Sequence, residues 1–386
     1  MPLHANAVWI DTMKIGYLVA RLGRGGAELQ VMSLARAMAA AGHEVEMLPY
    51  DGGSPYDDEL RGCGVAVVHS DAVGRGAKIA TTRTWLRSFA PDVVHAVMKR
   101  ASSVALLARL PRRSPAVIAT DLSTATYNRG NPALWASLLA FALADRVVTQ
   151  TDLNRRNLER LAPWLRGRTE VIRNGLDVVR FVPPAHDRPA MNPRPFRFCV
   201  AGTVYAVKNP ERVVRAVAEL RRRGRSGFRV DWYGRFARPS VAEPADAQRP
   251  HAIELAASLG VTDLIRFHGE VSAIETAYHD ADALLHASIQ EGFPNVVAEG
   301  MATGLPLVVS TVSELPLVVQ TARNGYVFDP LDVASIADAM ERMLDTPDAE
   351  RRAMGERSRE LAVSWFSLER FAGDFERLYR TLAARG

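Results

Sequence analysis

The stretch that decides the fold runs from Leu285 to Glu299 and reads LHASIQEGFPNVVAE. Residues 283–287 favour a short buried strand, and Gly292 and Pro294 mark a tight loop after it. A helix is expected to begin near Asn295. A helix that begins just after a strand and a Gly/Pro loop leaves its first amide N–H groups unpaired, and together with the positive end of the helix dipole they attract anions. The stretch therefore predicts an anion site.

Two glutamates flank this predicted anion site. Glu291 lies in the loop before the helix and Glu299 lies one turn inside it, so both carboxylates should stand beside a bound phosphate. Carboxylates near a bound polyanion are unfavourable unless they accept hydrogen bonds from hydroxyl groups. The combination fits a ligand with phosphates in its middle and sugars on both sides, which describes a nucleotide-sugar.

The same two glutamates carry a family resemblance. Separated by seven residues, with Gly-Phe-Pro after the first, they resemble the E-x7-E signature of retaining glycosyltransferases of family 4. The spacing alone would also fit two solvated glutamates on a loop and a helix surface. The resemblance implies that Glu291 is catalytic and faces the donor sugar, and that Glu299 binds the ribose. It implies further donor contacts from Gly292, Phe293, Pro294, Asn295, Val296 and Val297.

The length of 386 residues suits two domains of similar size. Apolar runs predict strands at residues 14–22, 44–48, 65–69, 92–96, 116–120, 146–149 and 170–172, and again at 196–201, 228–233, 264–268, 283–287, 305–310 and 325–328. Helical patterns separate them, which indicates parallel α/β sheets with ligands at the carboxyl ends of the strands.

The resemblance gives these halves an arrangement. It implies the GT-B fold, in which two Rossmann-like domains face each other across a cleft and the last helix crosses back to the first domain. We expect residues 1–185, with the final helix at 366–386, to form an acceptor-binding domain. Residues 195–365 would form the donor-binding domain, and the proline-rich stretch 182–195 would link the two.

A second group of residues should neutralise the donor diphosphate. The family pattern has Gly-Arg and, five residues after the arginine, a lysine; Lys208 matches the lysine, but Thr203 stands at the arginine position. A threonine hydroxyl supplies no charge, so another arginine is needed, and Arg24, Arg173 and Arg235 are the candidates.

Gly25 and Gly26 resemble the family's glycine-rich loop, in which amide groups can come close to phosphate.

Other motifs carry less information. The Asn174-Gly-Leu-Asp177 sequence, followed by Phe181 and Pro183, resembles the family's hinge between domains. Gly234 and His268 each end a strand where family members place donor-binding groups. A glycine or histidine at a strand end is also common in turns.

The acceptor side departs most from the family. Family members often carry a histidine where Leu122 stands. His95 matches the first histidine of a family pattern whose second position is Val97, which makes it a candidate catalytic residue, although a lone histidine at a strand end is more often structural. Asp121 is a candidate ligand for the sugar or the acceptor.

In a front-face retaining mechanism the departing phosphate oxygen can accept the acceptor's proton, so no protein base is obligatory. The resemblance also implies no metal ion and no cofactor, because Lys208 and the helix dipole would stabilise the leaving group.

Composition and charge bound the remaining possibilities. Two distant cysteines, Cys63 and Cys199, favour a reduced, cytoplasmic setting, and no apolar run is long enough for a membrane span. Residues 1–190 carry a net charge of +7 and the remainder −2. The basic first half, with Trp135 and Trp164, would suit a peripheral contact with an anionic membrane or simply a solvated surface. No motif for reading nucleic acid is present.

The sequence thus predicts a retaining glycosyltransferase. The donor would be a nucleotide-diphosphate sugar, with a UDP-sugar preferred over GDP-mannose, and the acceptor a hydroxyl of a glycan, a glycolipid or a small molecule. The alternatives are an epimerase or hydrolase of the same fold and a non-catalytic nucleotide-sugar binder. A dinucleotide-binding dehydrogenase is disfavoured, because G-x-G-x-x-G from Gly23 would require glycine at Glu28.

Overall fold

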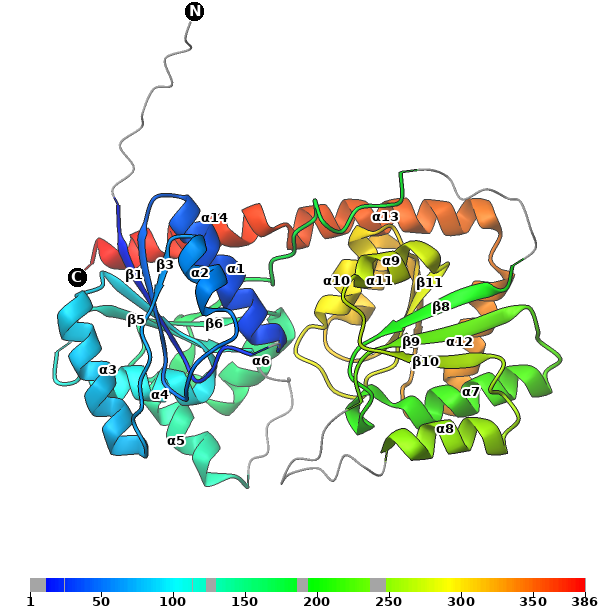
Figure 1. Cartoon of the computed structure of the whole chain (residues 1–386), viewed down its shortest axis with the longest axis horizontal. Coiled ribbons are helices and arrows are strands. Elements are labelled where there is room, and N and C mark those ends of the chain that lie inside the picture. Colours follow the sequence, from blue (N-terminus) through cyan, green and yellow to red (C-terminus); the bar gives the residue numbers. More distant parts are fainter. Residues whose placement is uncertain are drawn as a thin grey trace, which may run out of the picture. The chain divides into compact units, whose positions relative to one another are not determined.

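The computed structural model describes residues 12–23, 25–112, 114–122, 130–185, 194–236 and 248–385. The chain forms two compact units (Figure 1). The first comprises residues 1–175 and 368–386, and the second residues 176–367. The passage between them falls at Gly175, ahead of the proline-rich stretch that was expected to link them. Phe181 lies in the core of the second unit, and the carbonyl of Val182 accepts a hydrogen bond from His279 at 2.8 Å, so this stretch begins within that unit.

The first unit is built on a seven-stranded parallel sheet with the order β3-β2-β1-β4-β5-β6-β7. The strands are β1 (Lys14–Val19), β2 (Glu44–Pro49), β3 (Val65–Val67), β4 (Val93–Ala96), β5 (Ala116–Asp121), β6 (Arg146–Thr149) and β7 (Thr169–Val171). One face is covered by α1 (Gly26–Ala40), α2 (Asp57–Gly62) and the last helix, α14 (Leu368–Ala383). The other is covered by α3 (Arg75–Phe89), α4 (Met98–Arg109), α5 (Pro132–Phe141), α6 (Asp152–Leu161) and the 3-10 turn η1 (Pro163–Leu165).

The second unit repeats this plan with six parallel strands in the order β10-β9-β8-β11-β12-β13. They are β8 (Phe196–Ala201), β9 (Phe228–Tyr233), β10 (Ile265–Gly269), β11 (Ala283–His286), β12 (Leu307–Ser310) and β13 (Gly325–Phe328). The turn η2 (Ala206–Lys208) leads into α7 (Pro210–Arg222), which covers one face with α8 (Gln248–Ser258) and α12 (Val333–Asp345). The other face carries α9 (Ile274–Asp280), α10 (Asn295–Ala302), α11 (Leu315–Ala322) and α13 (Asp348–Phe366).

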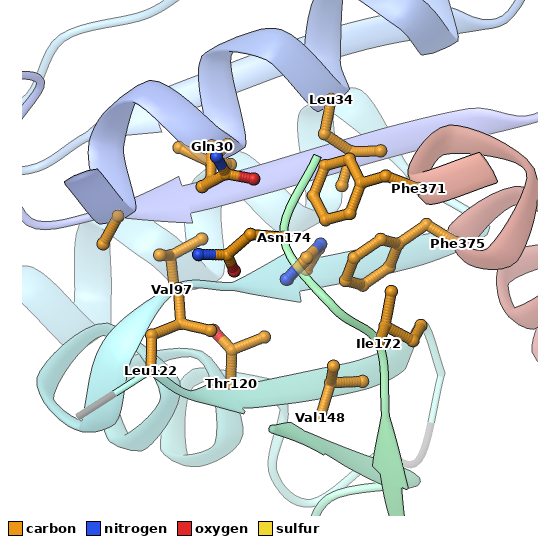
Figure 2. Close-up of a pocket in the computed structure, with 13 residues that line it drawn as sticks. Gln30, Leu34, Val97, Thr120, Leu122, Val148, Ile172, Asn174, Phe371 and Phe375 are labelled. Carbon is orange, nitrogen blue, oxygen red and sulfur yellow. The ribbon is translucent and has the colours of Figure 1, made fainter. Parts of the chain in front are cut away.

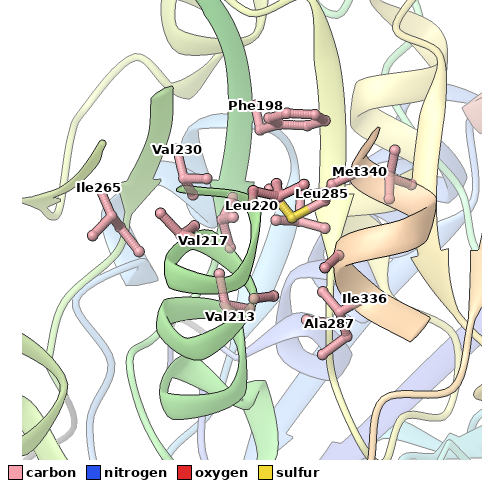
Figure 3. Close-up of a cluster of buried hydrophobic side chains, with 14 of the residues drawn as sticks. Phe198, Val213, Val217, Leu220, Val230, Ile265, Leu285, Ala287, Ile336 and Met340 are labelled. Atoms are coloured by element: carbon pink, nitrogen blue, oxygen red, sulfur yellow. The ribbon is translucent and has the colours of Figure 1, made fainter. Parts of the chain in front are cut away.

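The core of the second unit shows why these segments fold as they do. Figure 3 shows Val213, Val217 and Leu220 of α7 and Met340 of α12 against the side chains of the sheet. The α7 residues recur at helical spacing, so one face of the helix is apolar. Burying each such side chain contributes roughly 1.5–3 kcal/mol.

All thirteen predicted strands are present in the described residues, with ends that differ by at most three positions. The largest difference is in β1, which ends at Val19 although apolar residues continue to Leu22. Leu22 is a buried core residue that follows the strand and is not part of the sheet. The predicted start of α10 at Asn295 is confirmed, and α14 packs against α1 in the first unit, as expected for the last helix.

Candidate functional site

The second unit concentrates the predicted donor residues at one point of its sheet. Strand β8 leads into the loop that ends at Lys208, and its neighbour β11 leads into the loop that holds Glu291. The connections diverge here, because β8 is followed by a strand on one side and β11 by a strand on the other. Such switch points are where open α/β sheets bind ligands.

Lys208 and Glu291 meet at this switch point. The Lys208 ammonium group donates a short hydrogen bond to the Glu291 carboxylate, and each side chain is 17% exposed. The loops are also joined through their backbones, because the amide of Ile289 donates to the carbonyl of Val207 at 2.8 Å. The pair is therefore a mostly buried pair of opposite charges fixed between two loops.

His286, which was not among the predicted site residues, completes this cluster. Its Nε2 lies 3.5 Å from a Glu291 oxygen and 3.2 Å from the Ser288 hydroxyl, and the residue is 3% exposed. Burial lowers the pKa of His286, so the ring is held in its neutral form. No local signal marks this residue, because an apolar strand with a single histidine does not show where the ring points.

The electrostatics of the cluster keep Glu291 ionised. Burial by itself would raise its pKa, but the hydrogen bond from His286 and the charge of Lys208 lower the pKa to about 2. Glu291 is therefore a carboxylate, an acceptor of hydrogen bonds, across the physiological range.

The helix start beside Glu291 is built from Gly292, Phe293 and Pro294. The Gly292 carbonyl accepts from the Ser313 hydroxyl, the Phe293 ring packs on Phe366 at 4.8 Å, and Pro294 is the residue before α10. Among the first amides of α10, that of Val297 already donates to the Pro294 carbonyl at 3.0 Å. One of the three amides predicted to bind the anion, that of Val297, is therefore already occupied.

Glu299, the second glutamate, has a partner of its own. The hydroxyl of Tyr278, on α9, donates to Glu299 Oε2 at 2.7 Å. Burial raises the pKa of Glu299, while the Tyr278 hydrogen bond and the charge of Arg180 lower it in part. Tyr278 stands 21 residues before Glu299 and was missed, because nothing in the local sequence couples the two.

Glycines shape the loop that carries Lys208. Gly202 has φ +138°, and a Cβ there would lie 3.4 Å from Lys208 Cε. A Cβ at Gly234 would lie 2.0 Å from the carbonyl oxygen of Gly202, so only glycine lets the end of β9 approach the loop after β8. Gly234 is thus required by the closeness of two backbone segments.

The remaining donor candidates lie around this loop. Thr203 follows Gly202, and the next amide, that of Val204, donates to the Arg235 carbonyl at 2.8 Å, so Arg235 is placed beside the loop.

The other candidates lie elsewhere. Arg173 lies in the first unit, where it pairs with Asp152 at 3.6 Å, and Arg24 lies outside the described residues. His268 bonds with the buried Asp231 at 2.7 Å and stacks on Tyr233 at 4.5 Å between ring centroids.

In the first unit, His95 is a core residue. Its Nδ1 bonds with the Tyr379 hydroxyl at 2.7 Å, and its ring stacks on Phe375 at 4.8 Å, both on α14. Burial lowers the pKa of His95 to about 3. A neutral, enclosed imidazole bonded to a buried tyrosine is in the setting of a structural residue.

His95 and Leu122 both line an apolar pocket between α1, α14 and the carboxyl ends of the strands (Figure 2). In Figure 2, Gln30 and Leu34 come from α1, while Phe371 and Phe375 come from α14. The cavity measures about 20 Å³, which is room for roughly one water molecule. The Leu122 side chain packs against the core beside it.

Asp121 and the glycine loop lie at the same edge of the first sheet. Asp121 ends β5, is 1% exposed, and accepts a hydrogen bond from Lys99 at 2.7 Å. Gly25 precedes α1, and a Cβ at Gly25 would lie 2.2 Å from a Glu28 carboxylate oxygen. The Glu28 carboxylate therefore lies against the loop in which Gly25 and Gly26 were expected to approach phosphate.

Two absences hold for the described part of the chain. No group of three or more His, Cys, Asp and Glu side chains there is arranged to hold a metal ion. Within the same residues, no helix has both the length and the apolar character needed to cross a membrane.

The fold and the switch-point site define a class of α/β proteins with two Rossmann-like units. Among solved structures, a glycosyltransferase from Rickettsia africae ESF-5 matches with a TM-score of 0.82 and 18% identity over 97% of this chain and 99% of that chain. Anabaena Alr3699/HepE, solved in complex with UDP, matches with a TM-score of 0.80 and 16% identity over 96% of this chain and 100% of that chain. These likenesses show the GT-B fold.

Family models cover both units. Residues 25–175 match the glycosyl transferase 4-like domain, and residues 183–361 match the glycosyl transferases group 1 family. The chain therefore belongs to the group 1, family-4-like glycosyltransferases, and the resemblance drawn from E-x7-E is confirmed.

Curated relatives agree with this assignment. A D-inositol 3-phosphate glycosyltransferase of Salinispora tropica is 29% identical over 262 residues, which is 62% of this chain and 51% of that relative. The chain thus spans about half the length of this relative. One from Frankia alni is 28% identical over 383 residues, covering 90% of this chain and 92% of the relative.

Proposed function

We propose that this protein transfers a sugar from a UDP-sugar to a hydroxyl acceptor with retention of the anomeric configuration. The observation that carries the proposal is the Lys208–Glu291 pair at the switch point of the second sheet, in which Glu291 lies in the loop before the helix that carries Glu299. A cation, a carboxylate that is ionised across the physiological range and a second carboxylate match a ligand that is anionic in its middle and hydroxylated at both ends.

The proposed roles follow from these positions. The Lys208 ammonium and the Val296 amide hold the diphosphate, and the ammonium stabilises the charge that develops on the leaving group. When the diphosphate binds, the Lys208 ammonium group turns from Glu291 to the phosphate. The Glu291 carboxylate then accepts hydrogen bonds from the hydroxyls of the donor sugar. Glu299 accepts from the ribose hydroxyls.

Arg235 is our proposed replacement for the arginine that family members have at the Thr203 position. It is exposed, and its backbone carbonyl is bonded to the amide of the residue after Thr203, so its side chain begins beside the loop that ends at Lys208. Its planar guanidinium group suits a bidentate contact with a phosphate. With these two cations, transfer would need no metal ion.

The acceptor's proton would pass to the departing phosphate oxygen, since His95 is enclosed in the core. Asp121 remains a candidate for binding the acceptor hydroxyls, and its carboxylate pairs with the Lys99 ammonium group. The relatives named D-inositol 3-phosphate glycosyltransferase make D-inositol 3-phosphate the first acceptor to test, with glycan and lipid-linked acceptors after it.

A peripheral contact with an anionic bilayer is part of the proposal for such lipid-linked acceptors. Trp164 and Leu139 are 42% and 63% exposed, and Trp164 is joined to α5 through the carbonyl of Leu138 at 3.3 Å. Arg166 and Arg168 lie exposed on the same turn. Flotation with vesicles of phosphatidylglycerol, compared with neutral vesicles, tests this contact.

The transfer itself is tested by incubating the protein with UDP-glucose, UDP-N-acetylglucosamine or GDP-mannose in the presence of EDTA, with and without D-inositol 3-phosphate. We expect release of UDP that depends on the acceptor, and an α-anomeric product by NMR from an α-linked donor. Lys208→Met should abolish release, whereas Lys14→Met, which breaks the exposed Lys14–Glu44 pair, should not. Release without acceptor would favour a hydrolase, and tight binding without turnover for any acceptor would favour a non-catalytic binder.

A further inference from the structure

Tyr278 is a buried residue whose only polar atom is aimed at the proposed ribose site. It is 0% exposed, and its hydroxyl donates to Glu299 Oε2 at 2.7 Å. A buried hydroxyl that loses its partner costs about 1–3 kcal/mol, so this contact fixes the tyrosine and the carboxylate together. Tyr278 comes from α9, so the contact is made between two elements.

The hydrogen bond leaves the other carboxylate oxygen available. Among the residues that the structure describes, no group donates to Glu299 Oε1, and Glu299 is only partly buried. One oxygen is therefore held from the protein interior while the other can accept from a ligand. A carboxylate held in this way cannot rotate both oxygens away from the ligand.

The hinge-like motif that follows the first unit supports the tyrosine from behind. The Phe181 ring contacts the Tyr278 ring at 6.2 Å, and the Arg180 guanidinium lies 5.0 Å from the centre of the Phe181 ring. Arg180 also pairs with Glu275 at 3.0 Å. Phe181 is thus wedged between a cation and the tyrosine that holds Glu299.

Arg359 fastens this segment to the helix that carries Glu299. Its Nη1 donates to the carbonyls of Val178 at 2.9 Å, of Phe181 at 2.6 Å and of Ala302, the last residue of α10, at 2.9 Å. The segment 176–183 and α10 therefore share one support. The motif acts within the second unit, where it fixes the position of Tyr278 relative to α10.

We propose that Tyr278 is a positioning residue for nucleotide binding: its hydroxyl holds Glu299 Oε2, so that Oε1 is presented to the ribose 2′- and 3′-hydroxyls of UDP. The proposal rests on the proposed function, because it requires Glu299 to bind the ribose. It also gives a role in the same site to Phe181, which contacts Tyr278, and to Arg359, which binds the carbonyls of Phe181 and Ala302.

The test is calorimetric binding of UDP and of 2′,3′-dideoxy-UDP to the wild type and to Tyr278→Phe. We expect the loss of the hydroxyl to weaken UDP binding about tenfold. The dideoxy nucleotide lacks the groups that Glu299 contacts, so its affinity should be the same for both proteins. In a Glu299→Ala background, Tyr278→Phe should have no further effect on UDP binding.

Tyr326→Phe is the matched control. The Tyr326 hydroxyl pairs with Thr346 at 2.9 Å in the same unit and does not contact Glu299, so its removal should leave UDP binding unchanged. Equal weakening of both nucleotides by Tyr278→Phe would make its role merely structural and overturn the inference. Unchanged UDP binding by Tyr278→Phe, with binding lost in Glu299→Ala, would overturn it alone. Failure of the wild type to bind UDP, or normal binding by Glu299→Ala, would instead overturn the proposed function, and the inference with it.

Discussion

Gly234→Ala should damage the second unit and the donor site together. The added Cβ would lie 2.0 Å from the carbonyl oxygen of Gly202 and 3.1 Å from the amide nitrogen of Thr203. Both are backbone atoms, so they cannot rotate aside as a flexible side chain could. The loop after β8 must therefore move away from the end of β9, and Lys208 lies at the end of that loop.

The size of the effect follows from the bonds that this movement breaks. Three hydrogen bonds join the loop to the end of β9: Gly202 N to Tyr233 O at 2.9 Å, Trp232 Nε1 to Gly202 O at 2.9 Å, and Val204 N to Arg235 O at 2.8 Å. At about 1 kcal/mol each, their loss costs about 3 kcal/mol. For a unit of this size, that lowers the melting temperature by roughly 6–12 °C.

Differential scanning calorimetry of the full chain, with UDP titration at 25 °C, measures both consequences. Gly260→Ala is the control: Gly260 has φ +67° but nothing lies near its would-be Cβ. It should cost only the about 1 kcal/mol of a left-handed alanine and leave UDP binding intact. If the two variants lose equal stability and Gly234→Ala binds UDP normally, the close approach at Gly234 does not shape the site.

Three further changes test other parts of the account. Burial lowers the pKa of His95 from 6.5 to about 3, so the unfolded chain binds the extra proton and the first unit loses about 1.4 kcal/mol for each pH unit below about 6.5; melting curves from pH 7 to 5 should show this slope, and His95→Gln should remove it. Glu291, whose pKa is lowered from 4.5 to about 2, contributes stability that is present above pH 4.5 and lost as pH falls towards 2; Lys208→Met should raise that pKa, so acid unfolding of the second unit should begin at higher pH. Gly175→Ala places a Cβ 2.5 Å from the Phe371 ring and should destabilise the first unit by about 1–3 kcal/mol in urea unfolding, without changing UDP affinity.

Local sequence information was enough to predict the strands and the helix start at Asn295, whereas Lys208 was singled out through the family pattern. Each of these depends on a short apolar run followed by glycine, proline or a charged residue, and such signals are written within a few neighbouring residues. The order of the motifs along the chain then indicated two repeated α/β units.

The parts that were missed depend on contacts between distant residues. The Tyr278–Glu299 and His286–Glu291 contacts are set by how strands and helices pack, and neither has a local signature. The proline-rich stretch was expected to link the units because its composition is typical of linkers, but the burial of Phe181 begins the second unit earlier.

The measurement that tests the central claim most directly is calorimetric titration of UDP into the wild type, Glu299→Ala and the control Glu341→Ala, in EDTA. Glu341 is on α12 and pairs with Arg223 at 2.8 Å, so its loss removes a carboxylate of the second unit without touching the donor site. We predict micromolar binding of UDP by the wild type and by Glu341→Ala, and a loss of at least tenfold in Glu299→Ala, since a charge-assisted hydrogen bond contributes about 1.5–3 kcal/mol. Binding by Glu299→Ala that equals the wild type, or no UDP binding by any of the three proteins, would contradict the assignment of a nucleotide-sugar site to this helix start.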